Sequence, residues 1–136
     1  MRLIAALLFL AFPAHAGDLI SGHARVIDGD TVQIGDTRIR FLGIDAPEMK
    51  TPDGPLAKEA VRDIIAGAFV TCDGLYLDRY GRTVATCKVE EVDLGEEMLR
   101  RGWAWAYRRY LTDNIRDRYI ALEEGARMDG VGLWAE

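Results

Sequence analysis

Two short acidic segments have the residue types and spacing of a site for a hard cation. They are Asp28-Gly29-Asp30-Thr31 and Asp45-Ala46-Pro47-Glu48, and each follows a stretch with strand-like alternation. Carboxylates in turns, completed by a backbone carbonyl and water, suit the oxygen shell of calcium, and the sequence has no paired His or Cys set for zinc or copper. Taken singly, each segment is more simply explained as a turn, because Asp-Gly is common in hairpins and Asp-x-Pro at loop starts.

Two arginines and a glutamate accompany these acids and indicate phosphate chemistry. Hydrolysis of a phosphodiester adds negative charge around phosphorus and needs a base for the attacking water. Arginine pairs two phosphate oxygens through its planar fork and stays charged near neutral pH, which makes Arg40 and Arg82 candidates for this role. Glu48 lies beside the acidic segments without being needed as a ligand, so it is the candidate general base.

The segments that must position these residues begin with strand patterns. Three stretches alternate apolar and polar side chains and predict an antiparallel meander: 24–27, 31–34 and 37–42. Apolar residues at helical spacing then predict a helix from Leu56 to Ile65. Two further stretches, 69–72 and 84–87, flank a turn at 78–82 and predict a second hairpin.

Two later helices complete the predicted elements. Asp93, with Glu96 three residues later, forms a capping-box pattern, and Asp113 or Asn114 caps a last helix that ends before Gly130. Five strands with a helix between the third and fourth have the element order of an OB-fold barrel. The predicted fold class is therefore α+β, mainly β: a five-stranded OB-fold barrel with three helices. Such a barrel by itself indicates oligonucleotide or oligosaccharide recognition and not catalysis.

Three segments of the sequence together resemble the signature segments of the thermonuclease family, also called staphylococcal-nuclease-like. They are 27–31, 40–48 and 78–82, they occur in the family's order, and the likeness runs from about Val26 to Trp134. The resemblance implies one thermonuclease-like OB-fold domain over 17–136. It also implies a calcium-dependent endonuclease that hydrolyses single-stranded DNA and RNA and leaves 3′-phosphates.

The resemblance further implies a role for each matched residue. It gives three calcium ligands: Asp30, Asp45 and the backbone carbonyl of Ala46. It makes Glu48 the general base and assigns Arg40 and Arg82 to stabilising the charge at phosphorus. It suggests three substrate-contacting tyrosines: Tyr80, Tyr107 and Tyr110.

The first 16 residues have the pattern of a signal peptide. Arg2 precedes an apolar run over 3–12, and Ala14-His15-Ala16 supplies small residues for cleavage. The apolar run is shorter than the roughly 20 residues that span a bilayer. We therefore expect cleavage after Ala16, no membrane attachment afterwards, and a location outside the cytoplasm, in the periplasm or the medium.

Two cysteines remain in this exported chain, where the compartment is oxidising. Cys72 and Cys87 lie at equal distances from the turn centred on Arg79-Tyr80, so a hairpin would place them opposite each other. We expect a disulfide, with two buried free thiols as the alternative. The length of the mature chain indicates one domain, which we expect to be a monomer.

The charge pattern leaves the binding partner open. Of 17 basic and 22 acidic residues only Arg2 falls in the first 16, so the rest of the chain has six more acidic than basic side chains, which argues against tight non-specific nucleic-acid binding. Basic charge is concentrated in 100–118 among four aromatic residues. That segment could follow a single strand, or it could be an aromatic core stripe with a solvated arginine rim.

Two functions without catalysis also stay open. One is an inactive OB-type module that binds nucleic acid or another extracellular ligand. The other is a structural domain that binds calcium.

Overall fold

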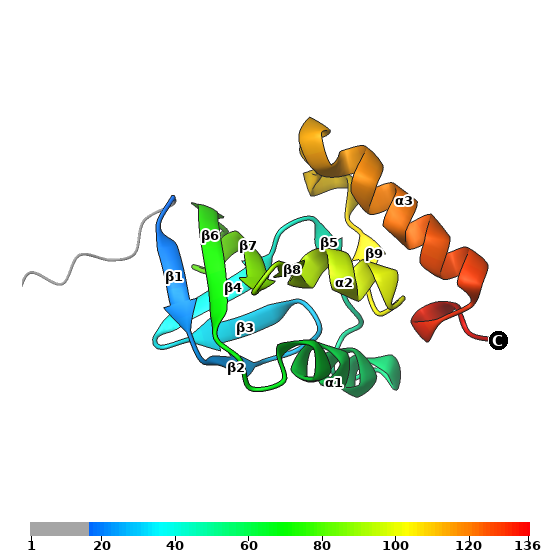
Figure 1. The fold of residues 1–136 in the computed structure, drawn as a ribbon, viewed down its shortest axis with the longest axis horizontal. Coiled ribbons are helices and arrows are strands. Elements are labelled where there is room, and N and C mark those ends of the chain that lie inside the picture. Colours follow the sequence, from blue (N-terminus) through cyan, green and yellow to red (C-terminus); the bar gives the residue numbers. More distant parts are fainter. Residues whose placement is uncertain (1–16) are drawn as a thin grey trace, which may run out of the picture.

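The computed structural model describes residues 17–136, and the predicted signal peptide at 1–16 lies outside the described residues. A twisted sheet rolled into a barrel occupies one side of the molecule, and the helices pack beside it (Figure 1). Within this described part, no helix has the length and apolar character to cross a bilayer.

Six strands build the barrel: β1 (Leu19–Gly22), β2 (Ala24–Val26), β3 (Thr31–Ile34), β4 (Thr37–Phe41), β6 (Val70–Leu77) and β7 (Thr83–Val89). β1 and β2 are two halves of one bent strand, because β1 pairs with β6 while β2 pairs with β3. The strand order β1-β6-β7-β4-β3-β2 therefore has this bent strand at both ends, and the barrel nearly closes. All neighbours in this order are antiparallel except β4 and β7, which are parallel. The predicted five-stranded barrel is confirmed, and β1 extends its first strand toward the N-terminus.

Three helices accompany the barrel, as predicted: α1 (Asp53–Ile65), α2 (Leu94–Arg100) and α3 (Asp113–Asp129). The side chain of Asp93 accepts a hydrogen bond of 2.9 Å from the backbone N–H of Glu96, so the predicted cap of α2 is confirmed. The predicted cap of α3, Asp113 or Asn114, is wrong by one or two residues. Thr112 has extended backbone angles and is the N-cap, and Asp113 is already helical.

Five short elements were not predicted: β5 (Ile44–Asp45), β8 (Val92–Asp93), β9 (Trp105–Ala106) and the 3₁₀ turns η1 (Arg108–Tyr110) and η2 (Gly132–Trp134). β5 and β9 pair with each other as a separate two-stranded ribbon. This ribbon brings the segment after β4 next to the segment before η1.

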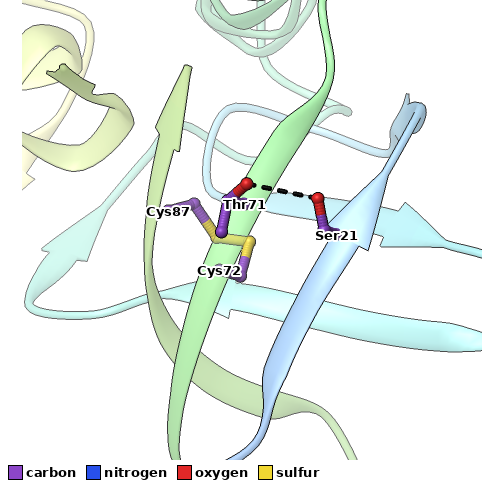
Figure 2. The surroundings of a disulfide bond; sticks show 4 residues. All are labelled: Ser21, Thr71, Cys72 and Cys87. Atoms are coloured by element: carbon purple, nitrogen blue, oxygen red, sulfur yellow. Dashed lines mark hydrogen bonds between the residues drawn. A yellow bond between two sulfur atoms is a disulfide. The ribbon is translucent and has the colours of Figure 1, made fainter. Parts of the chain in front are cut away.

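A disulfide joins Cys72 on β6 to Cys87 on β7 (Figure 2). The two residues are register partners with Cα atoms 4.0 Å apart, and both side chains are buried in the core. The hydroxyls of Ser21 and Thr71 lie within hydrogen-bonding distance between β1 and β6 beside it. The predicted disulfide is confirmed, and it links two long strands of the barrel.

The alternation of β4 decides which of its side chains reach the surface. Ile39 and Phe41 point into the core and are essentially fully buried. Arg38 and Arg40 therefore lie on the opposite, outer face of the strand. The polar site described below is built on this outer face.

Candidate active site

A cleft of about 410 Å³ lies on the outer face of the barrel and gathers residues from several separate segments. Its lining residues are Asp28, Asp30, Arg38, Arg40, Asp45, Ala46, Pro47, Glu48, Tyr80 and Arg82. Every metal ligand and catalytic residue predicted from the sequence is among them, together with one of the three predicted tyrosines. The loop before β3, the strands β4 and β5, the loop after β5 and the β6–β7 turn all contribute.

Asp30 links the two acidic segments. Its carboxylate is nearly buried, with one oxygen accepting from the Thr31 hydroxyl at 2.9 Å and the other from the backbone N–H of Ala46 at 3.0 Å. Gly29 allows this close approach, because a Cβ atom there would lie 2.7 Å from the Cβ of Ala46 and 2.8 Å from that of Ala57. The Asp-Gly pair is thus more than a hairpin turn: its glycine lets the first acidic segment pack against the second.

Three carboxyl groups crowd this side of the cleft. Burial, together with the adjacent charge of Asp30, raises the pKa of Asp28 to about 6, although Asp28 accepts a hydrogen bond from the Asp30 N–H. Burial and the charge of Asp30 also raise the pKa of Asp45, against the opposing effect of Arg40. Mutual repulsion of this kind is relieved by a cation.

The available ligands fit a hard cation that takes only a few of its ligands from the protein. Asp30, Asp45 and the carbonyl of Ala46 offer oxygen ligands only, which suits calcium or magnesium. Across residues 17–136, no group of three or more His, Cys, Asp or Glu side chains is arranged to hold a metal ion. A cation here would rely on two carboxylates, a carbonyl and water.

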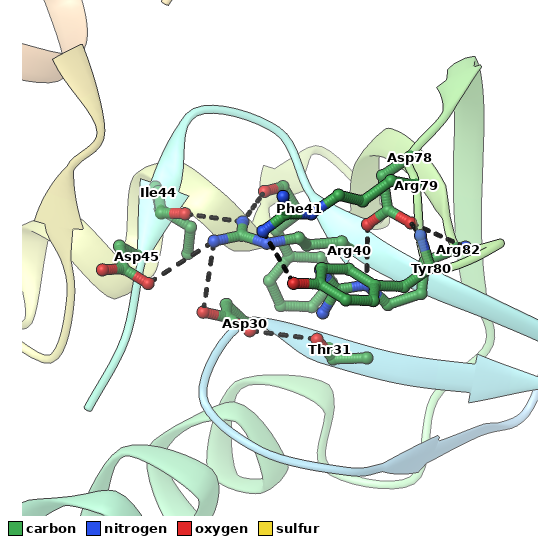
Figure 3. A network of polar contacts seen from close by, with 10 residues as sticks. All are labelled: Asp30, Thr31, Arg40, Phe41, Ile44, Asp45, Asp78, Arg79, Tyr80 and Arg82. Atoms are coloured by element: carbon green, nitrogen blue, oxygen red, sulfur yellow. Dashed lines mark hydrogen bonds and ion pairs between the residues drawn. The ribbon is translucent and has the colours of Figure 1, made fainter. Parts of the chain in front are cut away.

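Arg40 is held in a fixed position at the centre of the cleft (Figure 3). Its Nη1 donates to the carbonyl oxygens of Phe41 at 3.2 Å and Ile44 at 2.7 Å. Its Nη2 lies 3.6 Å from Asp30 Oδ2 and 3.4 Å from Asp45 Oδ1. The guanidinium is thus oriented before any ligand binds, which lowers the reorganisation that anion binding requires.

Arg82 is oriented by a residue that the sequence analysis did not assign. Asp78 accepts from Arg82 Nε at 2.7 Å with one oxygen, and from the backbone N–H groups of Arg82 and Tyr80 with the other. Burial acts to raise the pKa of Asp78, but these hydrogen bonds outweigh it and lower the pKa. The position of Asp78 at the start of the turn, four residues before Arg82, was the available signal.

Tyr80 covers this arm of the cleft. Its ring centroid lies 5.3 Å from the guanidinium carbon of Arg82 and 4.9 Å from that of Arg79, whose Nη2 donates to the Tyr80 hydroxyl (Figure 3). The Tyr80 side chain is 68% exposed, so it is accessible to a ligand in the cleft.

Glu48 differs from the other acids of the cleft because it is exposed. Within the described residues its carboxylate has no hydrogen bond or ion pair, while its backbone carbonyl accepts from the N–H and the hydroxyl of Thr51. A Cβ atom at Gly54 would lie 2.2 Å from that carbonyl oxygen, so a glycine is required there. The backbone of Glu48 is fixed, and its exposed carboxylate lines the cleft without a partner in the described residues.

Tyr107 and Tyr110 lie outside the lining of the cleft. The Tyr107 N–H donates to the carbonyl of Gly43, and its ring centroid is 5.8 Å from the guanidinium carbon of Arg40. The Tyr110 ring packs edge-on against Tyr107 with centroids 4.7 Å apart. The pair therefore lies beside the cleft, next to its central arginine.

Most arginines of segment 100–118 have acidic partners. The ion pairs are Arg100 and Arg101 with Glu97, Arg108 with Glu123, and Arg118 with Glu96. Trp103 packs against the hydrophobic core. These contacts favour the core interpretation, with an arginine rim, for Trp103, whereas Tyr107 and Tyr110 of the same segment are exposed.

Two charged lining residues, Asp28 and Arg38, received no role from the sequence analysis. Arg38 precedes Arg40 by two residues on the same strand, so the period of a strand already placed both on one face. Asp28 stood inside the first acidic segment, and its closeness to Asp30 was the available signal.

The fold and the cleft together define an OB-type barrel with a carboxylate and arginine site on its outer face. Residues 38–136 match the family model described as "Staphylococcal nuclease homologue". The chain belongs to this family, as the signature segments predicted.

Individual relatives agree with this assignment. A protein of Escherichia coli O157:H7 named "Uncharacterized endonuclease" is 33% identical over 135 residues, which cover 96% of this chain and 86% of the relative. A protein of Haemophilus influenzae with the same name is 32% identical over 117 residues, covering 82% of this chain and 64% of the relative. A "Probable staphylococcal-like nuclease" of Oryza sativa is 37% identical over 107 residues, covering 79% of this chain and 31% of the relative.

Proposed function

We propose that this protein is an exported, calcium-dependent endonuclease that hydrolyses phosphodiester bonds in DNA and RNA, with single strands preferred and 3′-phosphate products. The observation that carries the proposal is the cleft in which two oriented arginines face crowded carboxylates and one exposed glutamate. Family membership and the endonuclease names of relatives support the same chemistry.

Each of the main residues of the cleft would have its own role in the reaction. Arg40 and Arg82 would pair with oxygens of the scissile phosphate and stabilise the charge that develops there, since both are already oriented by hydrogen bonds. The carboxylate of Glu48 would accept the proton of the attacking water, while the 5′-oxygen leaves with the electron pair of the broken P–O bond and takes up a proton from solvent. The exposure of Glu48 and its lack of an ion pair or hydrogen bond within the described residues leave it available for this task.

Calcium would be held by the carboxylates of Asp30 and Asp45 and the carbonyl of Ala46. When bound, it supplies positive charge beside the phosphate and offsets the repulsion among the acids of the cleft. Asp28 touches the backbone of Asp30 and would keep the first acidic segment in shape.

Substrate contacts would come from exposed rings. Tyr80 offers an exposed ring at one arm of the cleft, and Tyr107 with Tyr110 offers a second surface beside Arg40. Rings stack on unpaired bases, which supports a preference for single strands.

Export from the cytoplasm is supported by two features. One is the signal-peptide pattern of 1–16, and the other is the Cys72–Cys87 disulfide, a bond that persists in oxidising compartments. We propose that the mature protein acts as a monomer in the periplasm or the medium.

The test is release of acid-soluble nucleotides from single-stranded DNA and from RNA, with calcium and with a chelator. We expect release that requires calcium and falls at least about a hundredfold in Glu48→Gln, the range for loss of a general base. Glu91→Gln is the matched control, because Glu91 is an exposed glutamate outside the cleft lining.

A measurement of metal binding distinguishes the proposed metal ligands from the proposed general base. Calorimetry should show that Asp30→Asn weakens calcium binding, whereas Glu48→Gln retains it. Equal loss of affinity in both variants would show that Glu48 is a ligand and not the base. No release by folded protein with several metals and either nucleic acid would overturn the proposal in favour of an inactive binding module.

A further inference from the structure

A row of polar side chains leads away from the cleft across three strands. In the strand register Arg25 on β2 is opposite Gln33 on β3, and Gln33 is opposite Arg38 on β4. Register partners project from the same face of a sheet, and Arg25 Nη2 donates to Gln33 Oε1 at 2.9 Å. The row crosses two strand spacings, roughly 10 Å.

The row ends at a second cavity of about 290 Å³, between β2 and the end of α1. Arg38 lines the cleft and Arg25 lines this second cavity, so the row connects the two. The nearly buried Val26 and Ile65 form apolar lining, and His23 and Arg62 lie among the other lining residues.

An exposed aromatic pair lies at the edge of the second cavity. His23 and Phe69 stack with ring centroids 4.3 Å apart and planes 24° apart. Phe69 is 63% exposed, although it is an apolar side chain. A flat, solvent-facing pair of rings next to a cationic side chain is the arrangement on which unpaired bases stack.

The arginines of the row are available for a phosphate. Neither Arg25 nor Arg38 forms an ion pair with any residue of the described chain, and both are exposed. Arg62, across the second cavity, is by contrast already paired with Glu59 at 3.1 Å. In a chain with an acidic excess, two unpaired guanidinium groups on one face, one of them lining the cleft, suit an extended anion that also occupies the cleft.

We propose that this row and the second cavity extend the binding site for a single-stranded polynucleotide beyond the cleft. Arg38 and Arg25 contact successive parts of its phosphate backbone, and the His23–Phe69 pair stacks one of its bases. The identity of the ligand rests on the proposed function. The extension adds a length requirement: strands too short to reach from the cleft to Arg25 bind more weakly.

The test is fluorescence anisotropy with labelled oligothymidylates, in the Glu48→Gln background with calcium so that strands stay intact. The longer probe has about 12 nucleotides, which is within the range of site sizes of OB folds, and the shorter has about 3, which is just below that range. We expect Arg25→Ala to weaken binding of the longer probe by about tenfold and to lower the magnitude of its logarithmic salt slope by about 0.7, the value for one phosphate contact on a single strand. The shorter probe should lose much less.

Further variants separate charge from stacking. Arg25→Glu should weaken binding of the longer probe beyond Arg25→Ala, and Phe69→Ala should weaken it by about tenfold without changing the salt slope. Lys88→Ala is the control, because Lys88 is an exposed cation on β7 outside both cavities.

The proposal is overturned if Arg25→Ala affects the longer probe no more than Lys88→Ala, or affects both probes equally. Failure of the proposed function would look different. It would appear as absent hydrolysis by the wild type, while binding that depends on Arg25 and on strand length would still support the extension.

Discussion

The buried carboxylate of Glu123 on α3 forms an ion pair with Arg108, which is about half exposed. We predict that removing one partner of this pair costs more stability than removing the other. The Glu123 side chain is 2% exposed, and its Oε2 lies 3.1 Å from Arg108 Nη1, whose side chain is 49% exposed. Within residues 17–136 this oxygen accepts no hydrogen bond, and the second cation, Arg127, lies 3.8 Å from the other oxygen. Arg108 is therefore the main compensation for a buried negative charge.

Removing either partner should have different consequences. Arg108→Ala leaves the carboxylate buried with only the more distant Arg127, so we expect a loss of about 2–3 kcal/mol, just below the usual cost of breaking a fully buried pair. Glu123→Gln leaves Arg108 half-exposed and free to hydrate, so we expect a loss of about 1 kcal/mol.

Urea unfolding of the oxidised protein, followed by tryptophan fluorescence, measures both values if the slope with urea is unchanged. Arg100→Ala is the control, because its pair with Glu97 is half-exposed on the arginine side and should contribute less than about 1 kcal/mol. A loss in Glu123→Gln equal to or greater than that in Arg108→Ala would refute the reasoning from burial.

Other expected outcomes concern the turn beside the cleft, the disulfide and a helix cap. The fold lowers the pKa of Asp78 below its unfolded value near 3.8, so the ionised carboxylate stabilises the protein at any pH above 3.8. This contribution is lost as the pH falls through the lowered pKa of the folded state. Urea midpoints of the wild type and Asp78→Asn should therefore differ at neutral pH and converge in acid. Replacing Cys72 and Cys87 by alanine should cost about 3 kcal/mol in the loop-entropy account, measured against the oxidised wild type by the same method. Asp93→Ala should cost about 1 kcal/mol, because α2 loses the acceptor for the N–H of Glu96, and a thermal melt unchanged from the wild type would contradict this role.

The parts of the fold that could be predicted from the sequence are those encoded by local patterns. Alternation in β3 and β4 and the helix cap at Asp93 involve neighbours along the chain, and all appear in the structure. The β5–β9 ribbon was missed because each strand has two residues, too few for a period to show. The half-strand β1 was missed because its pairing with β6 lies about 50 residues away along the chain.

The same division applies to the candidate site. Residues such as Asp30 and Arg40 belong to contiguous segments whose residue types by themselves suggest a chemistry. The role of Asp78 depends on a side chain turning back to Arg82, and the row from Arg25 to Arg38 depends on the register of three strands. Contacts of this kind are set by tertiary pairing, which composition and spacing do not report.

The acidic excess of the chain does not argue against a nucleic-acid substrate, because some arginines form ion pairs with glutamates whereas others have no acidic partner. Glu96, Glu97 and Glu123 are each held by arginines of α2, α3 or the intervening segment, so the basic segment 100–118 is largely neutralised. Arg25 and Arg38 have no acidic partner in the described chain and lie on the face that holds the cleft. A polynucleotide meets the local potential of that face and not the total charge. Counting charges along the chain therefore points to a segment whose arginines are mostly paired, whereas the strand register places the unpaired Arg25 and Arg38 next to the cleft.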